Sequence, residues 1–357
     1  MPKLWLPAYA FAVAALLAQP AAAQMAGIRP APTVQMPAQV DSNSPIVWRD
    51  GQMRVFNSAN SPVLSAGDGQ FALGESRPVR IEPKDSYGHW IESAWTDEDG
   101  AIYAWYHHEP PACGGALAMP EIGALVSYDG GESFENLGTV LSGSTEPDCG
   151  SRNGFFAGGH GDFSVIYDWN SGYFYFLFGN YGGPLAEQGV AIARMAFEDR
   201  TAPAGAVWKY FNGAWEEPGL GGHTTPVFQA RTSWQDAATE SFWGPSIHWN
   251  TYLESWVILM NRSCCRPMWP QEAVYVSFNP DLGYPEGWSA PERILERPQA
   301  YYPQVVGLGP FETDTVAGET ARLYLQGVSR HEIVFRRTGG EEWVEPEWPE
   351  AGEPPIE

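Results

Sequence analysis

The feature that most constrains the fold is a strand–turn–strand pattern that occurs five times along the chain. Each copy begins with a polar or proline-containing segment and continues into an apolar run. A turn rich in Gly, Asp or Asn then leads into a second, aromatic run. Turns of this kind between β-rich runs predict hairpins. The five predicted hairpins cover residues 44–56, 91–106, 162–178, 246–260 and 304–325.

Each of these hairpins is followed by a second pair of β-rich runs, so that the repeating unit is a four-stranded sheet. Five such sheets can form a ring that leaves few open edges. The chain is also 14% aromatic, with 39 Gly and 31 Pro, as expected for many short strands joined by turns. We therefore predict an all-β fold, a five-bladed β-propeller with four-stranded antiparallel blades over residues 41–339. The second pair of the last blade is predicted to run from 332–335 to Trp343.

The two ends of the chain differ from the repeat. Residues 1–23 combine Lys3, an apolar run and three alanines before Gln24, a pattern typical of a secretory signal peptide and too short to span a bilayer. We expect a secreted or periplasmic protein that is not inserted in a membrane. Residues 24–40 are predicted as an extended lead-in, and the acidic, proline-rich residues 340–357 as a disordered tail.

Charge and cysteines limit the partners and the chemistry. A formal net charge of -23 disfavours nucleic acid and anionic membranes as partners. Export permits disulfides, and Cys113 with Cys149 is the simplest pair. A bridge between Cys264 and Cys265 would be strained, and the spacing leaves the pairing open. None of the spacings is typical of a zinc site.

Propeller connectivity assigns a face to each loop. The inner strands begin on one face, here called the upper face, and the second strands return to it. Paired carboxylates on this face could perform glycoside hydrolysis. Each of them could instead be structural, as a strand cap, a loop carboxylate or a solvent-facing side chain. The candidate catalytic residues are Asp41, Glu109, Asp162 and Glu272.

Imidazole, aromatic and amide side chains gather on the same face, and they suit a sugar because aromatic faces stack on pyranose rings. His248 alternates with apolar neighbours and equally fits a core histidine. Trp105, Trp169 and Trp256 are predicted to pack within blades. The candidate substrate-binding residues are His89, Trp90, His107, His108, His160, Tyr181, Trp243, His248, Arg262, Tyr302 and Gln304.

Residues 127–134, with the sequence SYDGGESF, resemble the Asp-box of sialidases and related propellers. In such a motif the aspartate and the glycines hold a tight turn, and the aromatic residue packs beneath it. The motif is a folding device on the face opposite the candidate site. It therefore supports the propeller without assigning a sialidase activity.

Residues 41–335 resemble the five-bladed propeller glycosidases of the arabinanase and β-xylosidase clan, and more closely a set of uncharacterised secreted relatives. The resemblance implies an Asp base at the start of blade one, a second Asp at the start of blade three and a Glu acid at the start of blade four. Asp41 and Asp162 match the first two. Where the family reads Glu-Gly-Pro, this chain reads Trp243-Gly244-Pro245, so that Glu109 or Glu272 would have to replace the acid.

The functional prediction is a glycoside hydrolase-like protein that acts on an oligo- or polysaccharide. The alternatives are a non-catalytic carbohydrate-binding propeller and a protein-interaction propeller with an exposed apolar patch. The sequence leaves open whether the protein is an enzyme, which sugar it takes and whether hydrolysis retains or inverts configuration. We expect a monomer with a carbohydrate ligand and no cofactor, and an axial calcium or halide ion is left open because no run of ligands indicates one.

Overall fold

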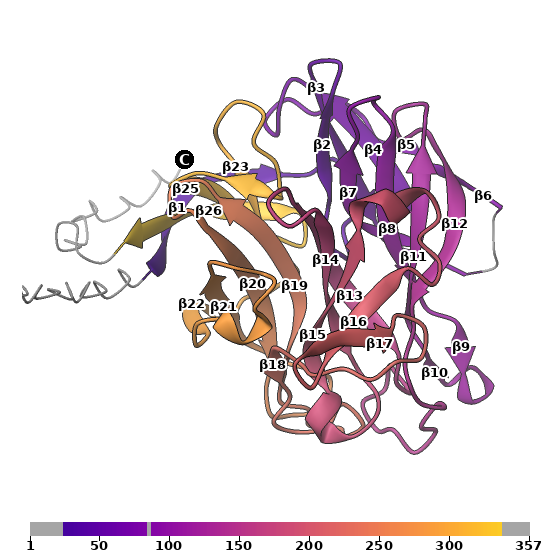
Figure 1. Ribbon diagram of the computed structural model, residues 1–357. Coiled ribbons are helices and arrows are strands. Elements are labelled where there is room, and N and C mark those ends of the chain that lie inside the picture. The colour runs from indigo at the N-terminus through magenta and orange to yellow at the C-terminus, as the bar shows by residue number, and fades with distance from the viewer. Residues whose placement is uncertain (1–23, 84–86, 338–357) are drawn as a thin grey trace, which may run out of the picture.

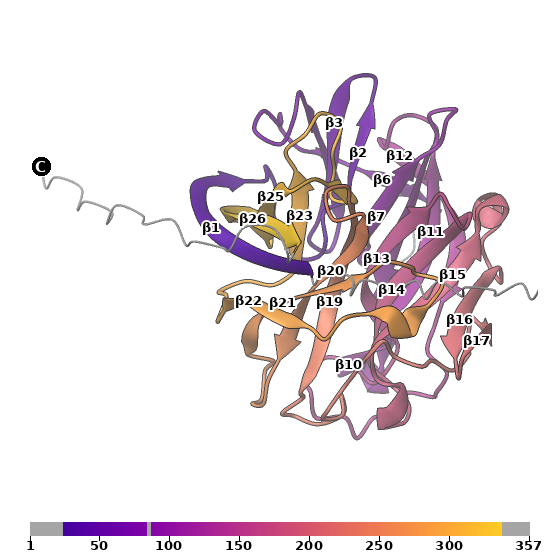
Figure 2. The same ribbon diagram turned by 60° about the vertical axis from the view of Figure 1, so that its left-hand side comes forward.

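The computed structural model describes residues 24–83 and 87–337. Small antiparallel sheets surround a common axis (Figures 1 and 2), and the predicted five-bladed propeller is confirmed. The predicted signal peptide and acidic tail lie outside the described residues. Within those residues, the helices lack the length and apolar character that a bilayer crossing would require.

Three blades take their strands from continuous stretches of the chain, and blade four does so apart from one short strand. Blade one contains β2 (Ile46–Arg49), β3 (Gln52–Ser58), β4 (Pro62–Gly67) and β5 (Arg77–Pro78). Blade two contains β7 (Trp90–Thr96), β8 (Ile102–His108), β11 (Glu121–Ser127) and β12 (Ser133–Leu141), with β6 (Arg80–Glu82) at its outer edge. Blade three contains β13 (His160–Asp168), β14 (Tyr173–Asn180), β15 (Gly189–Ala196), β16 (Val207–Phe211) and β17 (Ala214–Pro218), with β18 (Phe228–Gln229) beside β15.

Blade four contains β19 (Ser241–Asn250), β20 (Ser255–Ser263), β21 (Gln271–Asn279) and β22 (Glu292–Glu296), with β24 (Val316–Ala317) beside β19. A separate small hairpin pairs β9 (Pro111–Ala112) with β10 (Leu117–Ala118). Short 3-10 turns occupy the loops at η1 (Cys113–Gly115), η2 (Leu185–Glu187), η3 (Phe197–Thr201) and η4 (Pro285–Gly287).

Blade five joins the two ends of the described chain. Its inner strands are β23 (Pro303–Gly307), β25 (Thr320–Leu325) and β26 (Val328–Arg337), and its outermost strand is β1 (Gln24–Gln35). Figure 2 shows the indigo β1 curving alongside the yellow β26. The expected boundary at Asp41 is therefore wrong, because most of the expected lead-in is the closing strand of the ring. The expected fourth strand near Trp343 lies outside the described residues, and β1 occupies its place.

Serine hydroxyl groups connect blade one to blade two and blade two to blade three. Ser58 Oγ accepts the Ile91 N–H at 3.0 Å, and Ser93 Oγ accepts the Val165 N–H at 2.7 Å. Asn43 reaches across the axis, where its amide donates to the carbonyls of blade-three Phe163 at 2.9 Å and of blade-four Pro245 at 2.8 Å. The inner strands are thus held around a narrow axis that the Asn43 side chain crosses.

The core lies between neighbouring blades rather than inside a single layer. Between blades two and three, for example, Trp105 packs edge-on against Phe176 with ring centroids 5.7 Å apart. Aromatic rings of this size bury large apolar areas and fill the wedge between twisted sheets. Most of the aromatic side chains of the sequence therefore pack in the core between neighbouring blades.

Asp129 organises the tight turn between β11 and β12. Its Oδ1 accepts the Ser133 N–H and the Ser127 hydroxyl, both at 2.9 Å. Burial raises the pKa of this carboxyl, but the hydrogen bonds that it accepts together outweigh burial and lower the pKa. Phe134 is buried beneath the turn and packs edge-on against Phe56 of blade one. The turn therefore fastens the outer part of blade two to its neighbour.

Gly131 in this turn is expected to tolerate no side chain. Its φ is +89°, and a Cβ there would lie 2.4 Å from the Phe56 ring. We expect Gly131→Ala to lower the free energy of unfolding by about 2–4 kcal/mol, measured by denaturant unfolding. Gly172→Ala is the matched control, because its φ is +74° but nothing lies within 4 Å of the added carbon. An equal loss in the two variants would contradict the steric argument.

The four cysteines form two disulfides. Cys113 pairs with Cys149, the simplest of the pairings considered from the sequence. Cys264 pairs with the adjacent Cys265, a bridge that sequence spacing alone argued against. These two cysteines lie in the loop between β20 and β21, outside the paired strands.

Candidate functional site

Three inner strands carry a β-bulge near their upper ends. The pairing register shifts between Ile91 and Ser93 in β7, between Gly161 and Phe163 in β13, and between Trp243 and Ser246 in β19. A bulge leaves a residue out of the ladder and redirects its side chain. Glu92 and Asp162 occupy the first two bulges, whereas Gly244 and Pro245 occupy the third.

His107 is the centre of the resulting cluster. Its Nδ1 donates to Glu92 Oε1, and its Nε2 lies 3.7 Å from Glu109 Oε1. The second oxygen of Glu92 accepts the Phe163 N–H at 2.9 Å, which connects blade two to blade three. Trp90 stacks on the imidazole, with ring centroids 4.8 Å apart and planes inclined by 6°. These contacts fix both the position and the plane of the imidazole ring.

Asp162 completes the buried part of the cluster. One oxygen or nitrogen atom from each of Glu92, His107 and Asp162 lies within 4.8 Å of the others. Tyr181 donates its hydroxyl to Asp162 Oδ2, and Tyr302, directly before β23, also hydrogen-bonds this carboxylate. Residues from blades two, three and five therefore converge on one point.

Burial and mutual charge shift the pKa values in this cluster. Burial raises the pKa of Glu92 to about 7, although His107 acts in the opposite direction. For His107 burial lowers the pKa, but Glu92, Glu109 and Asp162 outweigh it and raise the pKa well above its usual value. The raised pKa of His107 therefore favours an imidazolium among these carboxylates.

Asp41 and Glu109 are the carboxylates of this cluster that reach solvent. Asp41 is exposed at the approach to blade one and Glu109 is half-buried, whereas Glu92 and Asp162 are buried. Partial desolvation raises the pKa of Asp41, with His107 lowering it and Glu109 raising it. An incoming ligand would meet these two carboxylates first, above a buried imidazolium.

An aromatic group fills the blade-four side of the site. Trp243 is buried and packs edge-on against Tyr302 at 5.6 Å and against Trp269 at 5.8 Å. Trp269 in turn packs against Tyr181 and Phe156. The position at which the resemblance implies an acid is therefore occupied by a packed indole.

Two predicted residues of blade four form a separate ionic group. Arg262 donates to both Glu240 and Glu272, and Glu272 also accepts from Arg293 at 3.0 Å. The Tyr275 hydroxyl donates to the same Glu272 carboxylate at 3.0 Å. The contacts of Glu272 are thus with this group and not with His107 or Asp162.

Four predicted histidines lie in packed positions. His89 packs at a tilt against Tyr106 and His108 packs edge-on against it, on the opposite side of β8 from His107. His160 packs against Phe178, and burial lowers its pKa well below the usual value. His248 packs against Phe335, and burial lowers its pKa to about 3, as fits the core histidine considered from the sequence. Gln304 exchanges hydrogen bonds with the backbone of Ser44 across the closing blades.

Glu92 is the residue that sequence reasoning missed. It is not among the candidate residues of the sequence analysis. The available signal was a carboxylate inside the apolar run of β7, because a charged residue at a buried strand position requires a partner. Trp269, in an irregular loop, gave no comparable signal.

Among residues 24–83 and 87–337, two groups of side chains have the atoms that a metal ion needs. In Glu92, His107 and Asp162 the carboxylate and the imidazole of the first two already bind each other. In Glu240, Cys264 and Cys265 both sulfur atoms belong to a disulfide and provide no thiolate. Neither arrangement favours a metal over the contacts that are present.

Comparison with known proteins gave similarities in fold. No family model and no curated protein matches the sequence. An exo-1,5-α-L-arabinanase from a bovine ruminal metagenomic library is 12% identical over 84% of this chain and 93% of its own, with a TM-score of 0.48. A thermostable family-43 glycoside hydrolase is 9% identical over 88% and 90%, with a TM-score of 0.49.

An exo-β-1,3-galactanase from Phanerochaete chrysosporium, solved with β-1,3-galactotriose, is also similar in fold. It is 13% identical over 85% of this chain and 64% of its own, with a TM-score of 0.49. These similarities assign no role to any residue of this chain.

Proposed function

We propose that the protein is a secreted or periplasmic, monomeric glycoside hydrolase-like protein that acts on an oligo- or polysaccharide at its upper face. The observation that carries this proposal is the pair Asp41 and Glu109, two solvent-reaching carboxylates in the field of one buried imidazolium. Glycoside hydrolysis needs one carboxyl group that donates a proton and a second that acts as base or nucleophile.

The roles follow from the surroundings of each carboxylate. Glu109 lies beside His107 Nε2, so a proton can pass between them, and Glu109 is the better candidate for the acid than Glu272 with its arginine partners. Asp41 is the candidate base. Asp162 is held by Tyr181 and Tyr302 beneath them and would position the imidazole and the sugar ring.

Asp41→Asn and Glu109→Gln are each expected to lower kcat/KM by about 10²–10⁴-fold, since each removes a group that transfers a proton or bonds to the sugar. The measurement uses the exported protein with a panel of aryl glycosides and neutral polysaccharides. Asp41→Asn should also remove the acidic limb of the pH profile, and that limb should lie above the ordinary pKa of an aspartate because the pKa of Asp41 is raised.

Glu272→Gln is the matched control, and it is expected to keep its activity. Thermal unfolding of all three variants should stay close to the parent, because Asp41 and Glu109 are not core residues. Turnover that survives both Asp41→Asn and Glu109→Gln would contradict the assigned roles. Loss of turnover in Glu272→Gln alone would transfer the acid role to Glu272.

A non-catalytic carbohydrate-binding propeller is the second candidate. The observation that favours it is Trp243, a packed indole at the position where the resemblance implies the acid. This candidate predicts binding of an oligosaccharide without release of any product. Isothermal titration alongside product analysis separates the two, and product formation would contradict it.

A further inference from the structure

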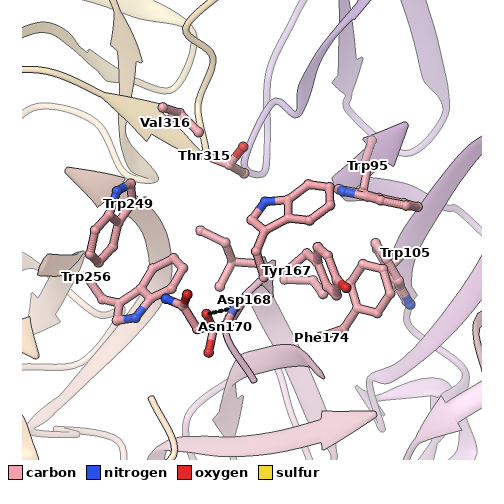
Figure 3. A pocket seen from close by; sticks show the side chains of 14 residues that line it. Trp95, Trp105, Tyr167, Asp168, Asn170, Phe174, Trp249, Trp256, Thr315 and Val316 are labelled. Carbon is pink, nitrogen blue, oxygen red and sulfur yellow. Dashed lines mark hydrogen bonds between the residues drawn. The ribbon is translucent and has the colours of Figure 1, made fainter. Parts of the chain in front are cut away.

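A hollow lies at the lower face, where the inner strands of blades two, three and four end. Its volume is about 350 Å³, within the range of small-molecule sites. It is called the basal pocket here, and Figure 3 shows it from close by. Its lining residues include Trp95, Tyr167, Asp168, Trp169, Asn170, Trp249, Trp256 and Thr315.

Aromatic rings form two walls of the basal pocket. On one side Trp249 packs edge-on against Trp256, with ring centroids 4.9 Å apart (Figure 3). On the other side Trp95 packs edge-on against Phe174 at 5.3 Å and against Phe197 at 5.7 Å. These contacts hold the rings in place before any ligand arrives, which reduces the ordering cost of binding.

Trp169 is the most exposed tryptophan of the described residues, with 70% of its surface open to solvent. The sequence predicted that Trp105, Trp169 and Trp256 pack within blades. The first and the third are buried, but Trp169 touches only the edge of the pocket through Tyr167 at 4.6 Å and Trp95 at 6.3 Å. A large aromatic ring left exposed beside a hollow is typical of a binding surface.

Polar groups lie between the two aromatic walls. Asp168 Oδ1 accepts the backbone N–H of Asn170 at 3.0 Å, and Figure 3 shows these two residues between Trp249 and Trp95, with Thr315 above them. The acidic surface and Asp168 disfavour an anion. A small cation would require rings that close around one point, whereas these rings line separate walls. A neutral ring with apolar faces and hydroxyl groups at its edges fits both the aromatic walls and the polar groups between them.

We propose that the basal pocket is a second binding site, and that it takes a neutral sugar unit of a glycan chain. Trp169 is the stacking platform, and the side chains of Asn170 and Thr315 are hydrogen-bond partners for sugar hydroxyls. The pocket is separate from the upper cluster, because Asp162 and Asp168 lie six residues apart on β13, roughly 20 Å along the strand. Asn43 crosses the axis between them.

The test measures binding in a protein whose upper site is disabled by Asp41→Asn and Glu109→Gln. The probes are hexasaccharides of β-1,4-xylose, β-1,4-glucose, β-1,3-glucose and α-1,5-arabinose, titrated by calorimetry and by tryptophan fluorescence. We expect at least one of them to bind, and Trp169→Ala to weaken its Kd by about tenfold or more, because a stacking ring is lost. Asn170→Ala should weaken it less.

Tyr128→Ala is the matched control, because this aromatic residue is 67% exposed and does not line the basal pocket. Its Kd should equal that of the parent. The proposal is overturned if none of the four hexasaccharides binds, or if Trp169→Ala leaves every Kd unchanged. It is also overturned if choline chloride binds at the pocket and no sugar does. None of these results depends on whether the upper site is catalytic.

Discussion

Replacing His107 with glutamine is expected to remove the activity on glycosides and to destabilise the protein. The imidazolium is the cation that compensates Glu92 and Asp162, both of which are buried. Breaking a buried charged pair by removing one partner costs about 3–5 kcal/mol, because the other charge stays behind. We expect a loss of this size at pH 6, together with a fall in kcat/KM of about 10²-fold or more as Glu109 loses its proton relay.

The pH dependence of this loss separates it from a simple packing effect. The folded-state pKa of Glu92 is about 7, above its ordinary 4.5, so that its contribution to stability falls as pH rises from 4.5 to 7. His107 has a raised pKa, and its contribution is complete below about 6.5 and is lost as pH rises through the folded-state value. His107→Gln removes this contribution. Its deficit should therefore be largest at pH 5 and 6 and shrink toward pH 8.

Denaturant unfolding of the parent and the variant at pH 5, 6, 7 and 8 measures this deficit. The matched control is His248→Gln, because His248 is also buried but stays neutral, with a pKa of about 3. Because the unfolded chain protonates this histidine below about pH 6.5 and the folded protein does not, the deficit of His248→Gln should be smallest at pH 5 and grow toward pH 8, opposite to that of His107→Gln. A constant deficit in His107→Gln would show that packing, and not charge, explains the loss.

Removing residues 24–35 is expected to have the largest effect on stability. Strand β1 pairs with β26 over most of its length, and Ala26 and Ile28 pack on the core between blades four and five. Losing these hydrogen bonds and apolar contacts should lower the free energy of unfolding by on the order of 5 kcal/mol. The newly exposed edge of β26 should also make the protein prone to aggregation.

Thermal unfolding and light scattering measure the two effects. Arg29→Ala is the control within the same strand, because it removes only the partly exposed ion pair with Glu332, worth at most about 1 kcal/mol. A shortened protein that unfolds within about 2 °C of the parent would show that β1 does not hold the ring closed.

The repeated hairpins were predictable because turns rich in glycine and aspartate separate consecutive β-rich runs. Such turns indicate that the chain reverses its direction between the two strands. Strand β1 was not, because Pro30 and Pro32 interrupt a segment with few apolar residues. Proline is tolerated at the edge of a sheet, where one side of the strand needs no backbone donor. An edge strand recruited from the far end of the chain therefore leaves little local signal in the sequence.

The sequence predicted which face of the propeller carries the site better than it predicted which side chains form the site. Connectivity brought Asp41, His107, Glu109 and Asp162 to the upper face. It could not distinguish His107 from His108, because neighbours in a strand point to opposite sides and bulges shift the register. Glu272 was placed with the site, but its arginine partners could be identified only in three dimensions.

The closing strand also determines when the molecule can finish folding. Arg29 and Glu332 are 303 residues apart, so β1 is synthesised well before β26 and must wait for it to pair. Blades one to four can assemble from local segments, whereas closure has a high loop entropy and comes late. A polypeptide still emerging from a ribosome or a translocation pore therefore keeps one unpaired edge. The ring can close only after β26 has been synthesised, and once β1 has paired with it that edge is no longer available to other chains.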